Sequence, residues 1–411
     1  MSAAYSLAMR PLFHSARRHG FSAAAPLLTL LLAAQLTGCQ LLQPSPATAG
    51  GLAPDHRLQE AQSTSVTHRP DGTVLVNGQS FFPFGFYHVS WAWQGTPEGR
   101  VQDLQRLSQA GFNLMVTEPI SDSDSANFTG LLDQAQQAGM FVIPYGLSPE
   151  NRQRVLQHPA LLGFKVADDA NVQYTPQQVA ERSAQFKALN PAKLTYFSLS
   201  VGQERPETPY FAAGDLIGNQ SYPIGNDDIG VTYRMMQSAV QSAVAQGNVP
   251  IANLQSSFWG ATKPTPAEVR NMTYQALLAG VKGIVYYAYR APEVDLNAEP
   301  FLWKSLQGLS REVALLAPLL LDGELITLNS GTAHAPLAAY LRGQTSGGEW
   351  QGYLLTVNTS RRESQSVDLQ LPEAPTRWER VGSAETATLR HDGPQVGGRL
   401  APLQVAVVRV R

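Results

Sequence analysis

The sequence is poor in the residues that build disulfides, metal centres and nucleic-acid surfaces. Its 411 residues include one cysteine, so an internal disulfide is excluded and a cysteine-based metal site is not expected. Neither a His-x-His pair nor a His-Glu-x-x-His motif occurs, and no glycine-rich phosphate loop is present, so we expect no metal and no cofactor. Only six residues are lysine and no stretch is a basic run, which argues against nucleic acid as a partner.

The one cysteine, Cys39, follows a short apolar stretch at residues 23–36, which Arg17 and Arg18 precede. A charged region, a short apolar core and small residues are typical of a secretory signal. The run Leu36-Thr37-Gly38-Cys39 resembles the bacterial lipobox, in which the cysteine is acylated and becomes the first residue of the mature protein. An ordinary secretory signal with a chance cysteine is the alternative.

The lipobox resemblance implies that residues 1–38 are a signal peptide and that lipid on Cys39 holds the mature chain on a membrane. Gln40 after the cysteine points to the outer membrane of a bacterial cell envelope. Residues 39–68 are rich in Pro, Ala, Gly, Ser and Gln and have no sustained apolar period, so they predict a flexible tether.

Short apolar runs alternate with helical segments over residues 69–322. Eight runs rich in aliphatic, β-branched or aromatic residues lie at 82–89, 113–118, 141–147, 161–167, 193–200, 216–222, 249–256 and 283–290. Alternating strands and helices predict a parallel sheet, and the length of this region fits a (β/α)₈ TIM barrel. A doubly wound open sheet is the competing fold, but the first strand is not followed by the glycine-rich turn that such folds usually carry. A short hairpin is expected at 73–82, ahead of the barrel.

Residues 323–411 have a different pattern. Short extended segments are separated by turn residues, and few helical patterns remain. This region predicts a small C-terminal antiparallel β-sandwich. The connection at 319–325 is short and apolar, so we expect the barrel and the sandwich to pack as one unit.

The carboxyl ends of the eight strands predict the site, because active sites of TIM barrels lie there. Aromatic rings, amides and carboxylates dominate these positions: Tyr87, His88, Trp91, Trp93, Glu118, Tyr145, Asp168, Asp169, Gln220, Tyr222, Gln255, Trp259, Tyr287 and Tyr289. Aromatic faces stack on the apolar faces of sugar rings, and amides and carboxylates bind hydroxyls, so the inventory predicts a carbohydrate partner. Packing in the core is an equally good interpretation for Tyr87, Tyr145 and Tyr287.

Four segments, in order along the barrel, resemble clan-A-type glycoside hydrolases, the cellulase and β-galactosidase-like barrels. Residues 76–87 look like their first strand, 158–169 like the fourth, 215–223 like the sixth and 280–287 like the eighth. The resemblance implies hydrolysis of a poly- or oligosaccharide. It also implies a general acid at the end of strand four, where this sequence has Asp169 in place of the family's glutamate.

The sequence departs from that family at the second carboxyl group. Gln255 occupies the position of the strand-seven nucleophile and cannot form a glycosyl ester. Turnover then needs a water activated by another acid, with Glu118 the first candidate, and this implies inversion. Asp168 is expected to point to the other side of its strand and to make a structural hydrogen bond or salt bridge.

Two functions therefore remain open. The first is a lipid-anchored glycoside hydrolase with Asp169 as general acid, its pKa raised by partial burial among Tyr145, Tyr222 and Trp259. The second is a non-catalytic carbohydrate-binding or scaffold lipoprotein that keeps a degenerate hydrolase barrel.

Overall fold

A computed structural model describes residues 56–88, 95–120, 127–200, 208–225, 228–258, 262–292, 294–328, 335–344, 348–382 and 388–410. Cys39, the predicted signal peptide and residues 39–55 of the predicted tether lie outside the described residues. Within the described part, no helix is both long and apolar enough to cross a membrane.

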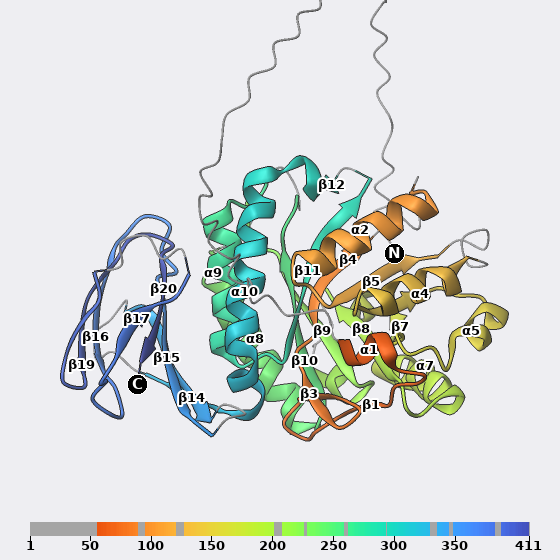
Figure 1. Ribbon diagram of the computed structural model, residues 1–411, viewed down its shortest axis with the longest axis horizontal. Helices are drawn as coiled ribbons and strands as arrows, with labels where there is room; N and C mark the ends of the chain where they lie inside the picture. Colours follow the sequence, from red (N-terminus) through yellow and green to blue (C-terminus); the bar gives the residue numbers. More distant parts are fainter. Residues whose placement is uncertain are drawn as a thin grey trace, which may run out of the picture. The chain divides into compact units, whose positions relative to one another are not determined.

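Within the described residues, eight parallel strands close into a barrel (Figure 1). They are β4 (Phe84–His88), β5 (Leu114–Pro119), β6 (Phe141–Tyr145), β7 (Gly163–Ala167), β8 (Leu194–Leu199), β9 (Leu216–Ser221), β10 (Val249–Gln255) and β11 (Gly283–Ala291). Each strand pairs with the next along the chain, and β11 also pairs with β4, which closes the ring. The predicted TIM barrel and all eight of its strands are confirmed.

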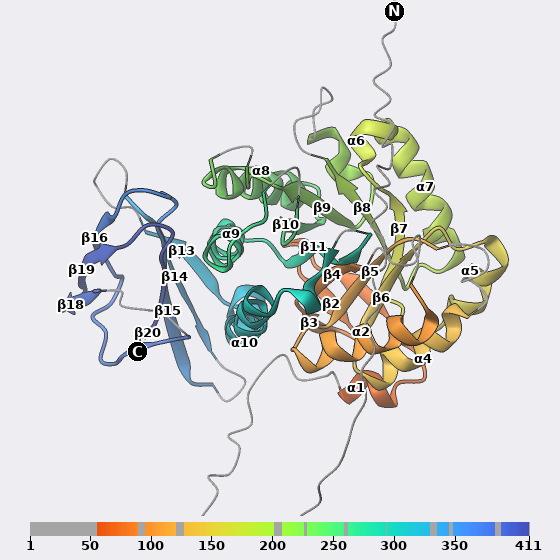
Figure 2. The same ribbon diagram turned by 90° about the horizontal axis from the view of Figure 1, so that it is seen from above.

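Helices surround the strands (Figure 2). They are α2 (Pro97–Gln109), α4 (Phe128–Gln137), α5 (Pro149–Val155), α6 (Ala170–Gln173), α7 (Pro176–Leu189), α8 (Val231–Ala245), α9 (Pro266–Ala279) and α10 (Pro300–Asp322), with short 3₁₀ turns at Thr208–Ala212 and Leu296–Ala298. Local sequence sets their limits. Thr175 and Thr265 form capping boxes, each followed by proline at the first helical position. Gly280 ends α9 with a φ of 91°, a left-handed conformation that glycine adopts without strain.

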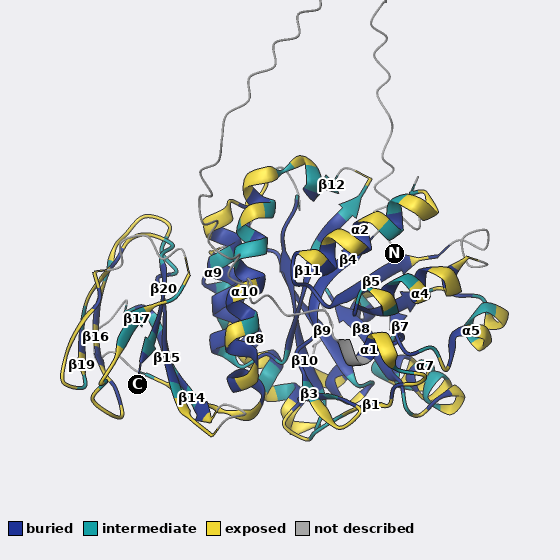
Figure 3. Cartoon of the chain, viewed as in Figure 1, coloured by how far each residue is buried: buried dark blue, intermediate teal, exposed yellow. Residues whose placement is uncertain are grey.

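The strand side chains pack in two layers. Phe84 and Phe86 on β4 join the hydrophobic cluster beneath the helices, whereas Tyr87 joins a second cluster inside the barrel. Successive side chains of a strand point to opposite faces, so both faces of each barrel strand are buried (Figure 3).

The N-terminal part of the described chain packs against the barrel. Helix α1 (His56–Glu60) leads into a three-stranded antiparallel sheet of β1 (Val66–His68), β2 (Val74–Val76) and β3 (Gln79–Phe81). The predicted hairpin is confirmed. The predicted tether is too long, because Leu58 and Val66 are buried and the Val66 amide donates to the Ala192 carbonyl, 2.9 Å. This segment has too few apolar residues to show a periodic pattern, and contact with the barrel orders it.

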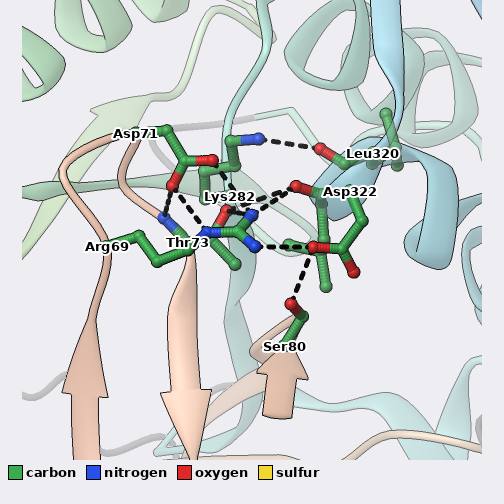
Figure 4. A network of polar contacts seen from close by, with 8 residues as sticks. Arg69, Asp71, Thr73, Ser80, Lys282, Leu320 and Asp322 are labelled. Atoms are coloured by element: carbon green, nitrogen blue, oxygen red, sulfur yellow. Dashed lines mark hydrogen bonds and ion pairs between the residues drawn. The ribbon is translucent and has the colours of Figure 1, made fainter. Parts of the chain in front are cut away.

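A polar network joins this hairpin to the end of α10 (Figure 4). The Arg69 guanidinium donates to the Leu321 carbonyl at 2.7 Å and to Asp322 Oδ1 at 2.7 Å. Lys282 donates to the Leu320 carbonyl at 2.8 Å, and Ser80 donates to Asp322. The last carbonyls of a helix lack partners within the helix, so these cations satisfy them and favour the negative end of its dipole.

Residues after α10 form two antiparallel sheets. The larger sheet has β13 (Glu324–Thr327), β14 (Leu337–Gln344), β15 (Trp350–Val357), β20 (Val405–Val410) and β17 (Trp378–Arg380). The smaller has β16 (Gln365–Gln370), β19 (Gln395–Leu400) and β18 (Arg390–Asp392), and an apolar layer lies between the two sheets. The predicted β-sandwich is confirmed.

The sandwich and the barrel share a continuous apolar core. Leu341 and Leu355 of the sandwich belong to the same buried cluster as Leu309 of α10. Asn271 of α9 is fully buried, and its amide donates to the Asn358 carbonyl at 2.8 Å and to the Leu403 carbonyl at 3.0 Å. The two parts lie within one compact unit, as the short apolar connection predicts.

Candidate active site

A buried lysine lies at the centre of the strand ends. Lys165, on β7, is fully buried, and its ammonium donates to Glu118 Oε1 of β5 at 2.7 Å. It also lies 3.0 Å from Asp168 Oδ1, which follows β7. The rings of Tyr87 and Tyr145 lie 4.6 and 4.9 Å from the same nitrogen. Two carboxylates and two aromatic faces compensate a charge that would otherwise be costly in the core.

The same network continues to Asp169. Ser198 on β8 donates to Asp168 Oδ1 at 2.6 Å, and its hydroxyl accepts the backbone amide of Asp169 at 3.0 Å. The side chain of Gln220 on β9 donates to Asp169 Oδ1 at 2.6 Å. Hydrogen bonds thus connect the ends of β5, β7, β8 and β9 around three carboxyl groups.

Both aspartates reach one network because the backbone turns between them. Strand β7 ends at Ala167, and Asp169 has a φ of 41°, in the left-handed region. The expectation that Asp168 points away from the pocket is therefore wrong, since the alternation of an extended strand no longer applies. Its expected structural role does hold, because it makes both a hydrogen bond and an ion pair.

Three polar groups form the floor beneath Lys165. The hydroxyls of Tyr87 and Tyr196 lie 2.6 Å apart, and Tyr196 donates to Asn253 Oδ1 at 2.9 Å. Asn253 Nδ2 donates back to Tyr87 at 3.3 Å. All three residues are buried, so this triangle fixes the ring of Tyr87 under the ammonium.

Burial separates the proton affinities of the three carboxyl groups. It raises the pKa of Glu118 to about 7, although the Lys165 charge opposes this. Burial and then the neighbouring Asp168 charge raise the pKa of Asp169. For Asp168, burial is outweighed by Lys165 and Ser198, which hold its pKa below the usual value. Lys165 stays protonated because Glu118 and Asp168 outweigh the effect of burial on its own pKa.

Further predicted site residues surround this network. Tyr145 and Tyr287 are half-buried, and the Tyr287 ring lies 6.0 Å from Tyr87 and 5.9 Å from Tyr222. Gln255 lies at the end of β10, but its amide is already used. It accepts the Ile224 amide at 3.0 Å and donates to the Ser257 carbonyl at 3.2 Å. Gln255 is buried, and both the oxygen and the nitrogen of its amide hydrogen-bond to the protein backbone.

His88 and Tyr289 lie away from this network, so their predicted substrate contacts are corrected. His88 is fully buried on the outer face of β4, and its Nε2 lies 3.0 Å from Asp103 Oδ2 of α2. Tyr289 packs 5.4 Å from the Trp303 ring of α10 and donates to Asn297. His88 lies on the outward side of β4, as Phe86 does. The register of β11 against β4 shifts between Tyr286 and Arg290, and this shift turns Tyr289 outward.

The predicted site residues Trp91, Trp93 and Trp259 lie outside the described residues. Among the described residues, no group of three or more His, Cys, Asp or Glu side chains is arranged to hold a metal ion. The space between Glu118 and Asp168, where a cation would sit, is occupied by the Lys165 ammonium.

Sequence reasoning missed the residue at the centre of the site. Lys165 stands inside the apolar run at 161–167, and a charged residue in a buried strand is a signal in itself, because lysine is almost never fully buried without partners. Tyr196 and Asn253 gave no such signal. Their alignment depends on the register of β8, β9 and β10, which only the closed barrel fixes.

Comparison with known proteins identifies the fold. No protein-family model and no curated protein sequence matches the chain. A glycoside hydrolase family 5 protein from Bacteroides vulgatus has a similar structure, with a TM-score of 0.58, 13% identity, and coverage of 88% of this chain and 95% of that one. An α-amylase from Geobacillus thermoleovorans has a TM-score of 0.56 at 11% identity, covering 84% of this chain and 99% of the amylase.

A third solved structure, Eubacterium rectale Amy13B, has a TM-score of 0.55 at 9% identity and covers 88% of this chain and 99% of its own. All three extend over the barrel and into the sandwich, because each covers more than four fifths of the chain. At such low identity the likeness shows a glycoside-hydrolase-like fold and does not carry their residues or substrates to this chain.

Proposed function

We propose that the protein is a glycoside hydrolase whose two catalytic carboxyl groups are Glu118 and Asp169. The observation that carries this proposal is that three carboxyl groups meet in one hydrogen-bonded network at the carboxyl ends of the barrel strands. Glu118 and Asp169 both have raised pKa values, while Asp168 between them is held ionised by Lys165. Glycoside hydrolysis needs one carboxyl group that carries a proton and one that does not.

The environments of the two groups assign their roles. Burial raises the pKa of Glu118 to about 7, so this group can hold a proton up to near-neutral pH, as a general acid must. Glu118 is therefore the general acid and Asp169 the general base, the reverse of the roles expected from sequence. The half-buried Asp169 is the more accessible of the two to water, which suits it to that task.

The reaction then proceeds as a single displacement. Glu118 gives its proton to the glycosidic oxygen as the bond from that oxygen to the anomeric carbon breaks. Asp169 takes a proton from the water that attacks the anomeric carbon, so the products are a free hydroxyl and a new reducing end. Gln255 cannot act as nucleophile, and this favours inversion of the anomeric configuration.

The experiment is a polysaccharide panel scored by release of reducing ends. We expect Asp169→Asn and Glu118→Gln each to lower kcat at least a hundredfold on any substrate that the protein cleaves, with little change in substrate affinity. Asp133→Asn is the matched control, because Asp133 is an exposed carboxylate on α4. Full activity in both site variants would refute the assignment.

A non-catalytic carbohydrate-binding role is the second candidate. Two features favour it: Gln255, an amide hydrogen-bonded to the backbone, stands at the usual nucleophile position, and Lys165 neutralises part of the acidic cluster. Under this role, sugars bind to the strand-end tyrosines without turnover. Calorimetry distinguishes this role from hydrolysis. A non-catalytic protein should bind a member of the panel that it never cleaves, and Tyr145→Ala should abolish that binding.

The lipid anchor on Cys39 belongs to the same proposal. The lipobox-like run before the cysteine supports this anchor. The anchor would hold the hydrolase at a bacterial membrane, and Gln40 favours the outer membrane. Cys39→Ala should abolish labelling with a fatty-acid analogue and release the protein into the soluble fraction. Unchanged labelling and fractionation would refute the anchor and leave the hydrolase proposal untouched.

A further inference from the structure

A hollow of about 510 Å³ lies between α9, α10 and the loop after β17. One face of α10 forms the long wall of the hollow. The lining residues on this helix are spaced three or four positions apart or adjacent to such positions: Phe301, Lys304, Ser305, Gly308, Arg311 and Leu315. Val381 and Gly382 of the sandwich form the opposite side. The volume is in the range of small-ligand sites, and no residue here belongs to the strand-end network.

The hollow carries positive charge. Arg270 and Glu312 also line it, but they neutralise each other, since Arg270 Nη1 lies 2.7 and 2.6 Å from the two Glu312 oxygens. Lys304 and Arg311 have no carboxylate partner among the described residues. Two cations thus face the hollow in a protein whose net charge is slightly negative, so the charge is local to this place.

The floor of the hollow is kept open by a glycine inside a helix. Gly308 lies in the middle of the 23-residue α10, where glycine is less favourable than alanine. A Cβ built at this position meets no atom within 4 Å, so neither packing nor backbone conformation requires the glycine. The missing side chain instead leaves room above the helix, between the two cations.

Apolar side chains flank the charged centre. Phe301 is 83% exposed at one end of the hollow, and Leu315 is 37% exposed at the other. Lys304 and Arg311 are seven residues apart, which is about 10 Å along a helix. That separation is comparable to two sugar units in an extended chain, and the exposed phenyl ring offers a surface for the apolar face of a sugar.

We propose that this hollow binds an acidic oligosaccharide, a sugar chain whose carboxylates pair with Lys304 and Arg311. It is a second binding site, separate from the strand-end network. The choice of a sugar over other polyanions rests on the proposed function and on the exposed Phe301. The cations supply charge-assisted hydrogen bonds to carboxylates, and the gap over Gly308 admits the sugar ring between them.

The test is calorimetric binding of trigalacturonate to the full-length protein at low salt. We expect Lys304→Met and Arg311→Met each to weaken binding at least fivefold, and Gly308→Gln, which fills the gap without removing charge, to weaken it at least tenfold. Gly308→Ala and Arg154→Met are the controls, because alanine leaves most of the gap and Arg154 is an exposed cation on α5. Both controls should bind as the unaltered protein does.

Three results would overturn the proposal. The first is that the protein binds neutral maltotriose as tightly as trigalacturonate. The second is that neither Gly308→Gln nor the two methionine variants change the affinity for trigalacturonate. The third is that a short oligodeoxynucleotide or anionic phospholipid vesicles bind more tightly than trigalacturonate. Asp169→Asn separates this site from the hydrolase proposal. Its binding of trigalacturonate should be normal, whether or not the unaltered protein cleaves any glycoside.

Discussion

Replacing Lys165 by methionine is the sharpest perturbation of the strand-end network. The substitution keeps most of the side-chain volume and removes a fully buried ammonium that holds Glu118 at 2.7 Å and Asp168 at 3.0 Å. Breaking a buried pair by removing one partner costs about 3–5 kcal/mol, because a charge is left uncompensated. We expect a loss of that size near neutral pH.

The loss should depend on pH with a definite sign. The pKa of Glu118 is raised from 4.5 in an unfolded chain to about 7 in the folded protein, which corresponds to roughly 3 kcal/mol. The protonated form is therefore favoured by folding, so this contribution is fully present below pH 4.5 and is lost as pH rises through about 7. Lys165 lowers this pKa, so in Lys165→Met the folded pKa moves higher still and the variant is more damaged at pH 8 than at pH 5.

Urea unfolding at pH 5 and pH 8 measures both effects, with Lys187→Met as a control at a partly exposed lysine. Adding Glu118→Gln to Lys165→Met should recover part of the loss at pH 8, because it removes the uncompensated charge. Lys165→Met alone should move the alkaline limb of kcat/KM upward from about pH 7, because it removes the charge that lowers the pKa of Glu118. An equal loss of stability at both pH values, with no recovery in the double variant, would refute the reasoning.

Four further changes test other contacts. Gln220→Leu removes the donor that lowers the pKa of Asp169, so the acidic limb of the pH–rate profile should move to higher pH; an unmoved limb would remove Asp169 from the mechanism. Thr265→Ala breaks the capping box of α9 and should cost about 1 kcal/mol in urea unfolding. Asn271→Ala leaves two buried carbonyls without their donor and should lower the free energy of unfolding by about 2 kcal/mol. Deletion of 323–411 should yield an insoluble barrel. A soluble barrel with unchanged melting behaviour would contradict the shared core.

Most of the fold could be predicted because its signals are local. Apolar runs separated by helices, with Gly280 after α9 and Thr265 before it, mark each βα unit without knowledge of any neighbour. The start of the folded chain could not be predicted in this way. Strand β1 is three residues long, and it is ordered by contacts such as that of Val66 with Ala192, which lie more than a hundred residues apart in sequence.

The site was predictable in its location and only in part in its chemistry. Strand-end positions gave Glu118, Asp168, Asp169 and Gln220, which the structure joins in one network. The inward or outward direction of a residue at a strand end depends on where the extended backbone stops. That limit follows from strand pairing and turn geometry, which is why His88 was misplaced.

Under the proposed function, the position of Lys165 explains how a barrel without the usual carboxyl pair can hold an acid and a base. Three carboxyl groups meet at the strand ends, and mutual repulsion alone would raise all of their pKa values. A single buried ammonium cannot compensate all three equally. It lies against Asp168 and Glu118, and Ser198 adds a hydrogen bond to Asp168 alone, so Asp168 becomes the fixed counter-ion.

The two remaining carboxyl groups then differ for separate reasons. Glu118 is almost wholly buried, and its burial outweighs the lysine charge. The half-buried Asp169 accepts a hydrogen bond from the Gln220 amide. Glu118 is thereby set to hold a proton up to near-neutral pH, while the Gln220 hydrogen bond opposes the rise in the pKa of Asp169. A non-catalytic sugar-binding surface has no need of a carboxyl group that is protonated near pH 7, whereas under the proposed function Glu118 uses that proton.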